Sequence, residues 1–176
     1  MVKEIARSIE IPKDVEVSVD GTLVKVKGPK GHLSKVLSYP GIEIKKENSQ
    51  VLVKAKLDRK QQQAMVGTLA SHINNMLKGV TEGFEYKMKA VYSHFPIQLK
   101  ASSKEVSITN FLGERQSRSA KILPGTKVEV QKDEVIITGI DKDNVGQTMA
   151  NIEQATRVKK FDVRVFQDGV YLVDKR

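Results

Sequence analysis

The sequence contains no cysteine and no tryptophan, and aromatic residues make up only 5% of its 176 residues. Without cysteine there can be no disulfide, no thiol nucleophile and no cysteine-bound zinc, which is consistent with a reducing cytoplasm. The scarcity of aromatic residues argues against a protein that binds RNA mainly by stacking several unpaired bases. No apolar run is long enough to cross a bilayer and no apolar signal-peptide core opens the chain, so we expect no membrane partner.

Residue groups typical of enzymes are also missing from the sequence. The three histidines, His32, His72 and His94, are far apart, and none has the spacing of a metal-ligand pair. There is no Gly-x-Ser-x-Gly motif, and the Gly-Pro-Lys-Gly segment at 28–31 lacks the Gly-Lys-Ser/Thr ending of a phosphate-binding loop. We therefore expect no catalytic residue, no metal, no cofactor and no small-molecule substrate.

What the sequence has in excess is positive charge. Thirty Lys and Arg residues against 21 Asp and Glu residues give a formal net charge of +9. Such a balance favours a polyanionic partner, nucleic acid first and an anionic membrane second, and no basic amphipathic helix supports the membrane. From charge alone, a soluble protein that is merely basic is an equally good interpretation.

Alternating apolar residues and turn signals predict that the first half is rich in β-strands and ends in one helix. Residues 1–10 are interpreted as a lead-in segment. A hairpin is predicted over 15–26, with its turn at Asp20-Gly21, and a second antiparallel pair over 42–53. From Asp58, the predicted N-cap, to Gly79, the predicted end, apolar residues recur at helical spacing. The stripe is Ala64, Met65, Leu69, Ile73, Met76 and Leu77.

The second half repeats this plan. Pro124-Gly125 follows Pro40-Gly41 at an offset of 84 residues, and Val135 and Ile137 follow Val51 and Val53 at the same offset. A second helix is predicted from Asp141, with Val145, Met149 and Ile152 as its stripe, and Phe161–Val165 is aligned with Phe84–Met88. We therefore predict an α+β fold of two tandem similar domains, 1–82 and 83–176. Each is an antiparallel β-sheet with one covering α-helix.

The C-terminal stretch 154–176 combines a basic segment with extended runs. Arg157, Lys159 and Lys160 follow the predicted end of the second helix. The runs FDVRVF and VYLV are joined at Asp168-Gly169, which predicts a hairpin with a type I′ turn. Arg164 and Phe166 would share one face of the first run. A basic helix end beside an outward arginine suits a phosphate-rich partner.

Charges in the second half are unevenly distributed. The segment 115–121 has three cations and no acid, whereas 129–153 has six acids against Lys132 and Lys142. One end of this domain is therefore suited to a polyanion. The first 80 residues nevertheless carry the larger positive excess, so charge alone does not choose the second domain. Lys and Arg loops favour contacts with phosphates and 2′-hydroxyls of folded RNA, with a steep salt dependence. Phe111, Phe166 and Tyr171 are candidates to stack or wedge, although core packing is the preferred interpretation for Tyr171.

Three segments together closely resemble one family. They are the GPKG loop at 28–31, NFLGER at 110–115 and the terminal QATRVKKFDVRVFQDGVYLV. This sequence resembles the universal large-subunit ribosomal protein six family, in its archaeal/eukaryotic form, over essentially the whole chain. The Tyr-Lys-Gly-Lys-Gly loop of bacterial members is absent.

The resemblance implies a structural, non-enzymatic component of the large ribosomal subunit made of two similar domains. It implies binding to large-subunit rRNA, mainly through the second domain, near the sarcin–ricin loop. The implied location is the stalk base, by the subunit interface and the factor-binding region. The motif residues carried over are Gln154, Arg164, Phe166, Asp168, Gly169 and Tyr171, with Asp168 and Gly169 assigned to the turn.

These observations give a set of expected rRNA contacts. They are Arg115, Arg118, Lys121, Arg157, Lys159, Lys160, Arg164, Phe166, Lys175 and Arg176. Lys27, Lys30 and Lys35 form a possible secondary contact with RNA or protein. The expected partners are large-subunit rRNA and neighbouring ribosomal proteins at the stalk base, and the expected location is the cytoplasm, in the ribosome. Two alternatives stay open, a free-standing basic RNA-binding regulator and a protein–protein scaffold.

Overall fold

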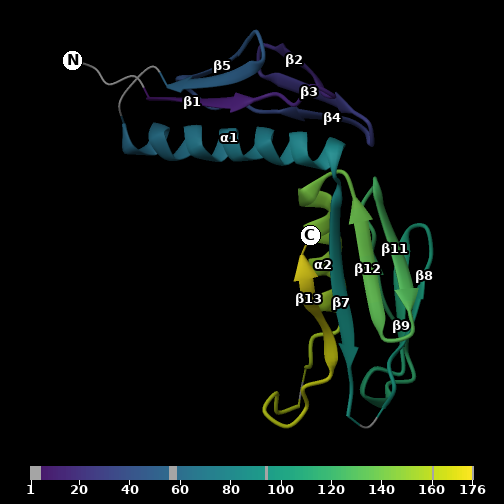
Figure 1. Cartoon of the computed structure of the whole chain (residues 1–176). Coiled ribbons are helices and arrows are strands. Elements are labelled where there is room, and N and C mark those ends of the chain that lie inside the picture. The colour runs from purple at the N-terminus through teal and green to yellow at the C-terminus, as the bar shows by residue number, and fades with distance from the viewer. Residues whose placement is uncertain (1–4, 56–58, 94, 160, 176) are drawn as a thin grey trace. The chain divides into compact units, whose positions relative to one another are not determined.

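The computed structural model describes residues 5–55, 59–93, 95–159 and 161–175. The chain divides into two compact units, Met1–Gly83 and Phe84–Arg176, each with its own hydrophobic core. Each unit combines antiparallel sheets with one α-helix (Figure 1). The predicted α+β class with two similar domains is therefore confirmed. Within the described ranges, no helix is long and apolar enough to cross a membrane.

The first unit contains two three-stranded sheets and the helix α1. One sheet has the order β1-β6-β5 and the other β2-β3-β4. The strands are β1 (Ile5–Glu10), β2 (Glu16–Asp20), β3 (Leu23–Gly28), β4 (Gly31–Val36), β5 (Ile42–Glu47) and β6 (Gln50–Ala55), and α1 spans Lys60–Thr81. Alternation explains the strands, since every second residue of β6 from Val51 is buried. The same sheet contacts α1, whose Ile73 and Val80 are fully buried.

Three local predictions for this unit were wrong. Residues 5–10 form β1, which pairs with β6, instead of a lead-in; its described side chains are mostly exposed, so the apolar alternation was weak. The helix continues beyond Gly79 to Thr81, and Gly83 is the left-handed glycine after it, with a φ of 76°. Ala64, placed on the apolar stripe, is exposed. Asp58, the predicted cap, lies outside the described residues.

The second unit has a four-stranded sheet, a three-stranded sheet and the helix α2. The sheets have the orders β11-β12-β7-β13 and β10-β9-β8. The strands are β7 (Phe84–Val91), β8 (Gln98–Ala101), β9 (Glu105–Thr109), β10 (Arg118–Lys121), β11 (Thr126–Gln131), β12 (Glu134–Gly139) and β13 (Gly169–Lys175). A 3-10 turn, η1, spans Phe111–Gly113, and α2 spans Lys142–Ala155. The predicted cap is confirmed, because the Asp141 carboxylate accepts a 3.0 Å hydrogen bond from the Asp143 N–H.

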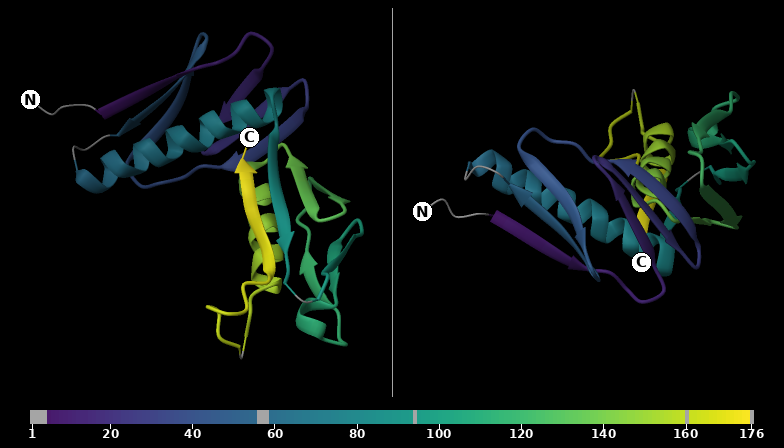
Figure 2. Two further views of the ribbon diagram at one scale, coloured as in Figure 1. Left: turned by 60° about the horizontal axis from the view of Figure 1, so that its bottom comes forward. Right: turned by 90° about the horizontal axis from the view of Figure 1, so that it is seen from above.

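The strand orders of the two units show that one part of the predicted repeat was wrong. The order β7-β12-β11 repeats β1-β6-β5, so the counterpart of β7 is β1. The alignment of Phe161–Val165 with Phe84–Met88 was therefore wrong. Strand β13, which extends the sheet beyond β7, belongs to the second unit alone among the described residues (Figures 1 and 2).

The predicted C-terminal hairpin was also wrong. Residues 161–168 form no strand, and β13 pairs with β7, Gly169 opposite Val91. Neither Asp168 nor Gly169 has the positive φ that a type I′ turn requires. Asp162 closes a turn instead, because its carboxylate accepts from the Arg164 N–H at 2.9 Å and its carbonyl from the Phe166 N–H at 2.9 Å.

Candidate nucleic-acid interface

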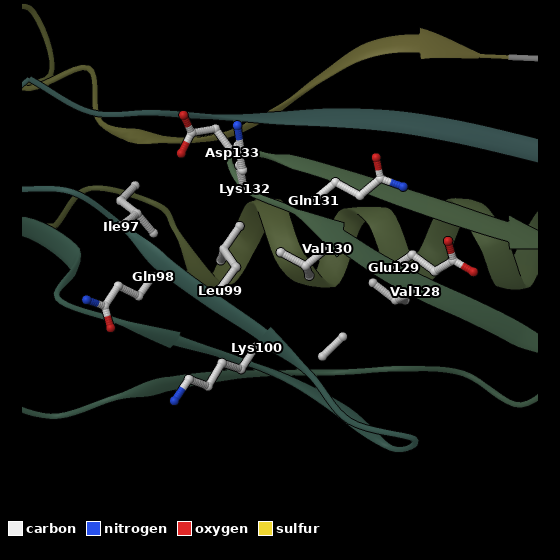
Figure 3. A pocket seen from close by; sticks show the side chains of 11 residues that line it. Ile97, Gln98, Leu99, Lys100, Val128, Glu129, Val130, Gln131, Lys132 and Asp133 are labelled. Atoms are coloured by element: carbon white, nitrogen blue, oxygen red, sulfur yellow. The ribbon is translucent and has the colours of Figure 1, made fainter.

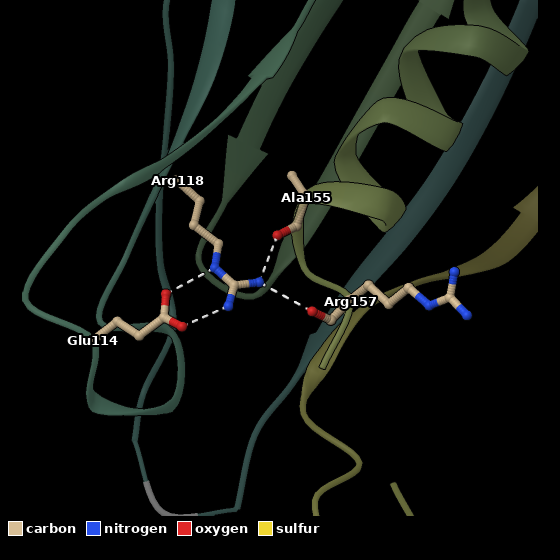
Figure 4. Close-up of polar contacts among 4 residues, drawn as sticks. All are labelled: Glu114, Arg118, Ala155 and Arg157. Carbon is tan, nitrogen blue, oxygen red and sulfur yellow. Dashed lines mark hydrogen bonds and ion pairs between the residues drawn. The ribbon is translucent and has the colours of Figure 1, made fainter. Parts of the chain in front are cut away.

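Three segments of the second unit meet at one end of it. They are the loop from η1 to β10, the C-terminal end of α2, and the segment 157–167 that precedes β13 (Figures 1 and 4). Arg118, at the start of β10, connects them. Its Nη1 donates to the carbonyls of Ala155 at 2.9 Å and Arg157 at 3.1 Å. The end of the helix is thereby fixed to the start of β10, 37 to 39 residues earlier in the chain.

The Arg118 guanidinium uses its other nitrogens on Glu114. Nε and Nη2 donate to the two carboxylate oxygens at 2.8 and 2.6 Å, a bidentate pair (Figure 4). The guanidinium carbon lies 4.3 Å from the centre of the Phe111 ring, which is 1% exposed. Phe111 is therefore a core residue. We call the Arg118–Glu114 pair the brace, because the bonds of Arg118 hold this end of the domain together.

The pKa of Glu114 reflects its contact with Arg118. The hydrogen bond from Arg118 holds the pKa of Glu114 below its ordinary value, against a smaller opposing effect of burial. The positive charges of Arg118 and Lys159 lower this pKa further. Lys159 is thus close enough for its charge to act on the η1 loop.

Four exposed cations lie in the segments that meet here, and we call them the basic end: Arg115, Arg157, Lys159 and Arg164. Arg157 gives only its carbonyl to Arg118, and its side chain extends away from the brace (Figure 4). Arg164 lies in the turn closed by Asp162. Lys160 lies outside the described residues.

Other expected contacts lie away from the basic end. Lys175 pairs with Tyr86 while Gly169 pairs with Val91, so Lys175 is at the opposite end of β13, about 20 Å away. Its Nζ lies 5.7 Å from the Tyr86 ring. Lys121 is exposed at the end of β10, about 10 Å along the strand from Arg118. Arg176 lies outside the described residues.

A pocket of about 440 Å³ opens beside the basic end. It lies between the last turns of α2 and the 163–167 segment, and its lining includes Glu153, Gln154, Arg157, Val163, Phe166 and Tyr171. Sequence reasoning missed this pocket and preferred the core for Tyr171, which is 43% exposed. The alternation of β13 contained the signal, because Val170 is buried and Tyr171 must face the other way.

A larger pocket, about 970 Å³, lies between the edge strands β8 and β11 (Figure 3). Half-buried Leu99, Val128 and Val130 contribute apolar surface to it. Its charged lining residues are Lys100, Lys132, Glu129 and Asp133. Acids and cations balance, so this pocket lacks the positive potential of a phosphate-binding surface.

In the first unit, the Gly-Pro-Lys-Gly loop packs on the end of α1. The backbone N–H of Lys30 donates to the Val80 carbonyl at 3.0 Å, and its ammonium donates to the Glu82 carbonyl. These bonds satisfy carbonyls at the helix C-terminus and place a positive charge there. The half-buried Lys35 has its Nζ 3.4 Å from Nδ1 of His72, whereas Lys27 is exposed on β3.

Tandem α+β units and a formal net charge of +9 place this chain in the class of basic two-domain α+β proteins. Among the residues that the structure describes, no group of three or more His, Asp or Glu residues could hold a metal ion. The sequence matches the family described as Ribosomal protein L6 over residues 11–83 and 95–169, one match in each unit. The chain belongs to this family.

Curated relatives agree over the full length of the chain. The chain is 60% identical over 176 residues to the large ribosomal subunit protein uL6 of Methanothrix thermoacetophila, covering all of both proteins. It is 54% identical over 175 residues to the uL6 of Methanosarcina mazei, covering 99% of each. With the uL6 of Methanobrevibacter smithii it shares 51% over 171 residues, 97% of this chain and 96% of that one. Membership confirms the expected archaeal-type, non-enzymatic ribosomal protein, with rRNA binding as the general activity of the family.

Proposed function

We propose that this chain is a structural constituent of the large ribosomal subunit and binds its rRNA through the basic end of the second unit. The observation that supports this proposal most is that Arg118 and Arg157 have different roles. Arg118 is used within the fold, and it fixes the backbone from which the exposed Arg157 and Lys159 project. Cations on a fixed backbone bind phosphates with little ordering cost.

The position within the subunit is part of the same proposal. The two most family-specific segments, NFLGE and RVFQDGVYLV, both contribute to this end of the unit. Glu114 belongs to the brace, and Phe166 and Tyr171 line the adjacent pocket. Resemblance in these segments supports binding near the sarcin–ricin loop at the stalk base, close to the subunit interface and the factor-binding region. Neighbouring proteins at the stalk base are the proposed protein partners.

Cations away from the basic end are proposed to make secondary contacts. Lys121 and Lys175 are exposed and suit phosphates on a different part of the RNA surface. Lys160 and Arg176 keep their proposed role from the sequence. In the first unit, Lys27 is the proposed peripheral contact, since the ammonium of Lys30 is used on the end of α1.

The test compares two triple variants with the same charge change. Arg157→Gln, Lys159→Gln and Arg164→Gln remove the described exposed cations beside the helix end. Lys100→Gln, Lys104→Gln and Lys127→Gln remove exposed cations from β8, the β8–β9 turn and β11. The affinity of each for large-subunit rRNA is measured against salt concentration.

For the first variant we expect weaker binding and a log–log salt slope shallower by about 2–3, since each lost phosphate contact removes roughly 0.7–0.9. The second variant should keep nearly the wild-type slope. Equal salt slopes for the two variants would show that the basic end is not part of the rRNA interface. A protein that sediments mainly outside ribosomes in cell extract would favour a free-standing regulator instead.

A further inference from the structure

We propose that the pocket between α2 and the 163–167 segment receives one unstacked base of the rRNA, a base that carries an exocyclic amino group. This inference rests on the proposed function, because the basic end must hold the phosphates on either side of that base. It adds a base-reading site to an interface that otherwise contacts the RNA backbone.

The pocket has an aromatic wall held in a fixed position. The Tyr171 hydroxyl donates to the Gln167 carbonyl at 3.2 Å, which tethers the tip of the ring. A Cβ on Gly169 would lie 2.9 Å from the ring, so the ring packs directly on the glycine backbone. Tyr171 is nevertheless 43% exposed, which leaves ring surface for a ligand. A tethered aromatic ring with open surface is a stacking platform for a base.

The 163–167 part of the pocket lining is also held in place. Phe166 lines the pocket, and its ring centre is 5.0 Å from that of Phe161, a tilted aromatic pair. The turn closed by Asp162 positions Val163, another lining residue, which is 63% exposed. Hydrogen bonds to Asp162 and the ring contact with Phe161 therefore hold the 163–167 segment in this conformation.

Beside the cationic Arg157, the pocket has two polar lining residues that suit a base. Glu153 contributes a carboxylate, which repels a phosphate and accepts hydrogen bonds from an amino group. Gln154 adds an amide that can both donate and accept. Adenine, cytosine and guanine have exocyclic amino groups, whereas uracil has none. Selection of an amino-bearing base follows.

Arg157 connects this pocket to the phosphate-binding surface. It lines the pocket and also belongs to the basic end, with Arg164 next to the lining residue Val163. A nucleotide extruded from a folded RNA presents the same arrangement, a planar base with anionic phosphates on either side. The pocket therefore suits the base of one nucleotide, and the cations beside it suit the phosphates.

The experiment uses the full chain bound to large-subunit rRNA, with two readouts. Hydroxyl-radical cleavage reports protection of the RNA backbone, and reagents that modify Watson–Crick edges report the accessibility of single bases. The variants are Tyr171→Leu, which removes the ring, and Tyr171→Phe, which keeps the ring but removes the hydroxyl. Val173→Ala, at a residue of the same strand that is 68% exposed, is the control. Thermal unfolding confirms that each variant is folded.

For Tyr171→Leu we expect the backbone footprint to persist at saturating protein, while one A, C or G becomes several-fold more reactive. The affinity should fall about 5- to 150-fold, the usual effect of losing one base stack. Tyr171→Phe and Val173→Ala should retain base protection. Changing the identified base to U should also weaken binding to the wild-type protein.

The outcomes separate this inference from the function on which it rests. No backbone footprint with the wild-type protein would overturn the proposed function. A normal footprint in which Tyr171→Leu changes no single base would overturn the base site alone. In assembled subunits, ultraviolet crosslinking of Tyr171 to a protein and to no nucleotide would also overturn it.

Discussion

At the scale of single residues, Arg118 and Arg157 differ in a way that the sequence conceals. Both lie in basic segments of the second unit. Arg118 donates four hydrogen bonds within the domain, and its side chain is only 21% exposed. Arg157 contributes a backbone carbonyl and keeps its side chain outside. The same residue type therefore supports the fold in one position and is exposed to solvent in the other.

We predict that Arg118→Lys destabilises the second unit by about 2 kcal/mol, since one ammonium cannot serve both carboxylate oxygens and both carbonyls. The free energy of unfolding in urea measures this. Arg115→Lys is the matched control at an exposed site three residues away, where we expect a change within about 0.5 kcal/mol. If Arg118→Lys were as mild as the control, the brace would contribute nothing to stability.

At the candidate interface, the sequence indicated where cations cluster better than it indicated what each side chain does. Basic residues near 115–118 and 157–164 were found because clusters of charge are visible in one dimension. Whether Phe111 and Tyr171 are buried or exposed depends on which side of the backbone each faces. For Phe111, the η1 turn decides this. Its Leu112 has a positive φ of 50°, which periodicity does not reveal.

At the scale of elements, the contact between the Gly-Pro-Lys-Gly loop and α1 gives that loop a structural role. A Cβ on Gly28 would lie 2.7 Å from Cγ2 of Val80 and 2.9 Å from its carbonyl oxygen. Only glycine lets the strand approach the helix closely enough for the N–H of Lys30 to reach the same carbonyl. The loop thereby serves as a C-terminal cap.

We expect Gly28→Ala to destabilise the first unit by about 1–3 kcal/mol through this overpacking. Hydrogen exchange should show faster opening of the last turn of α1, with the second unit unchanged. Gly67→Ala, within α1, is the control because its Cβ would meet Arg7 at an ordinary 3.7 Å. Helix propensity predicts that it stabilises by about 0.5–1 kcal/mol. The same sign for both variants would contradict the close-packing argument.

Elements were predictable where local pattern and pairing agreed. Asp141 capped α2 as expected, and the antiparallel pair predicted over 42–53 is the β5–β6 pair. The run 161–166 alternates like a strand, yet β13 pairs with β7 instead. Pairing of β13 with β7, a strand distant in sequence, is a tertiary event, and the local hydrogen bonds of Asp162 favour a turn over an extended run.

At the scale of the whole molecule, the duplication has produced units with different surfaces. The sheet β1-β6-β5 recurs as β7-β12-β11, and the second unit adds β13 and the 157–167 segment that leads into it. Those additions contribute Arg157, Lys159 and Arg164 to the basic end, and Tyr171 to the pocket. We therefore attribute the proposed division of function to what the second unit adds to a shared framework.

We predict that the separate halves, residues 1–83 and 84–176, differ in how they bind RNA. Each unit has its own core, so each half should unfold cooperatively by itself. The second half alone should reproduce most of the backbone footprint of the intact chain on large-subunit rRNA and most of its salt slope, because the basic end lies entirely within it. The first half, despite its larger positive excess, should bind weakly and without a defined footprint. Footprints from the first half that account for most of the protection would show that net charge, and not the arrangement at the end of α2, determines where this protein holds its RNA.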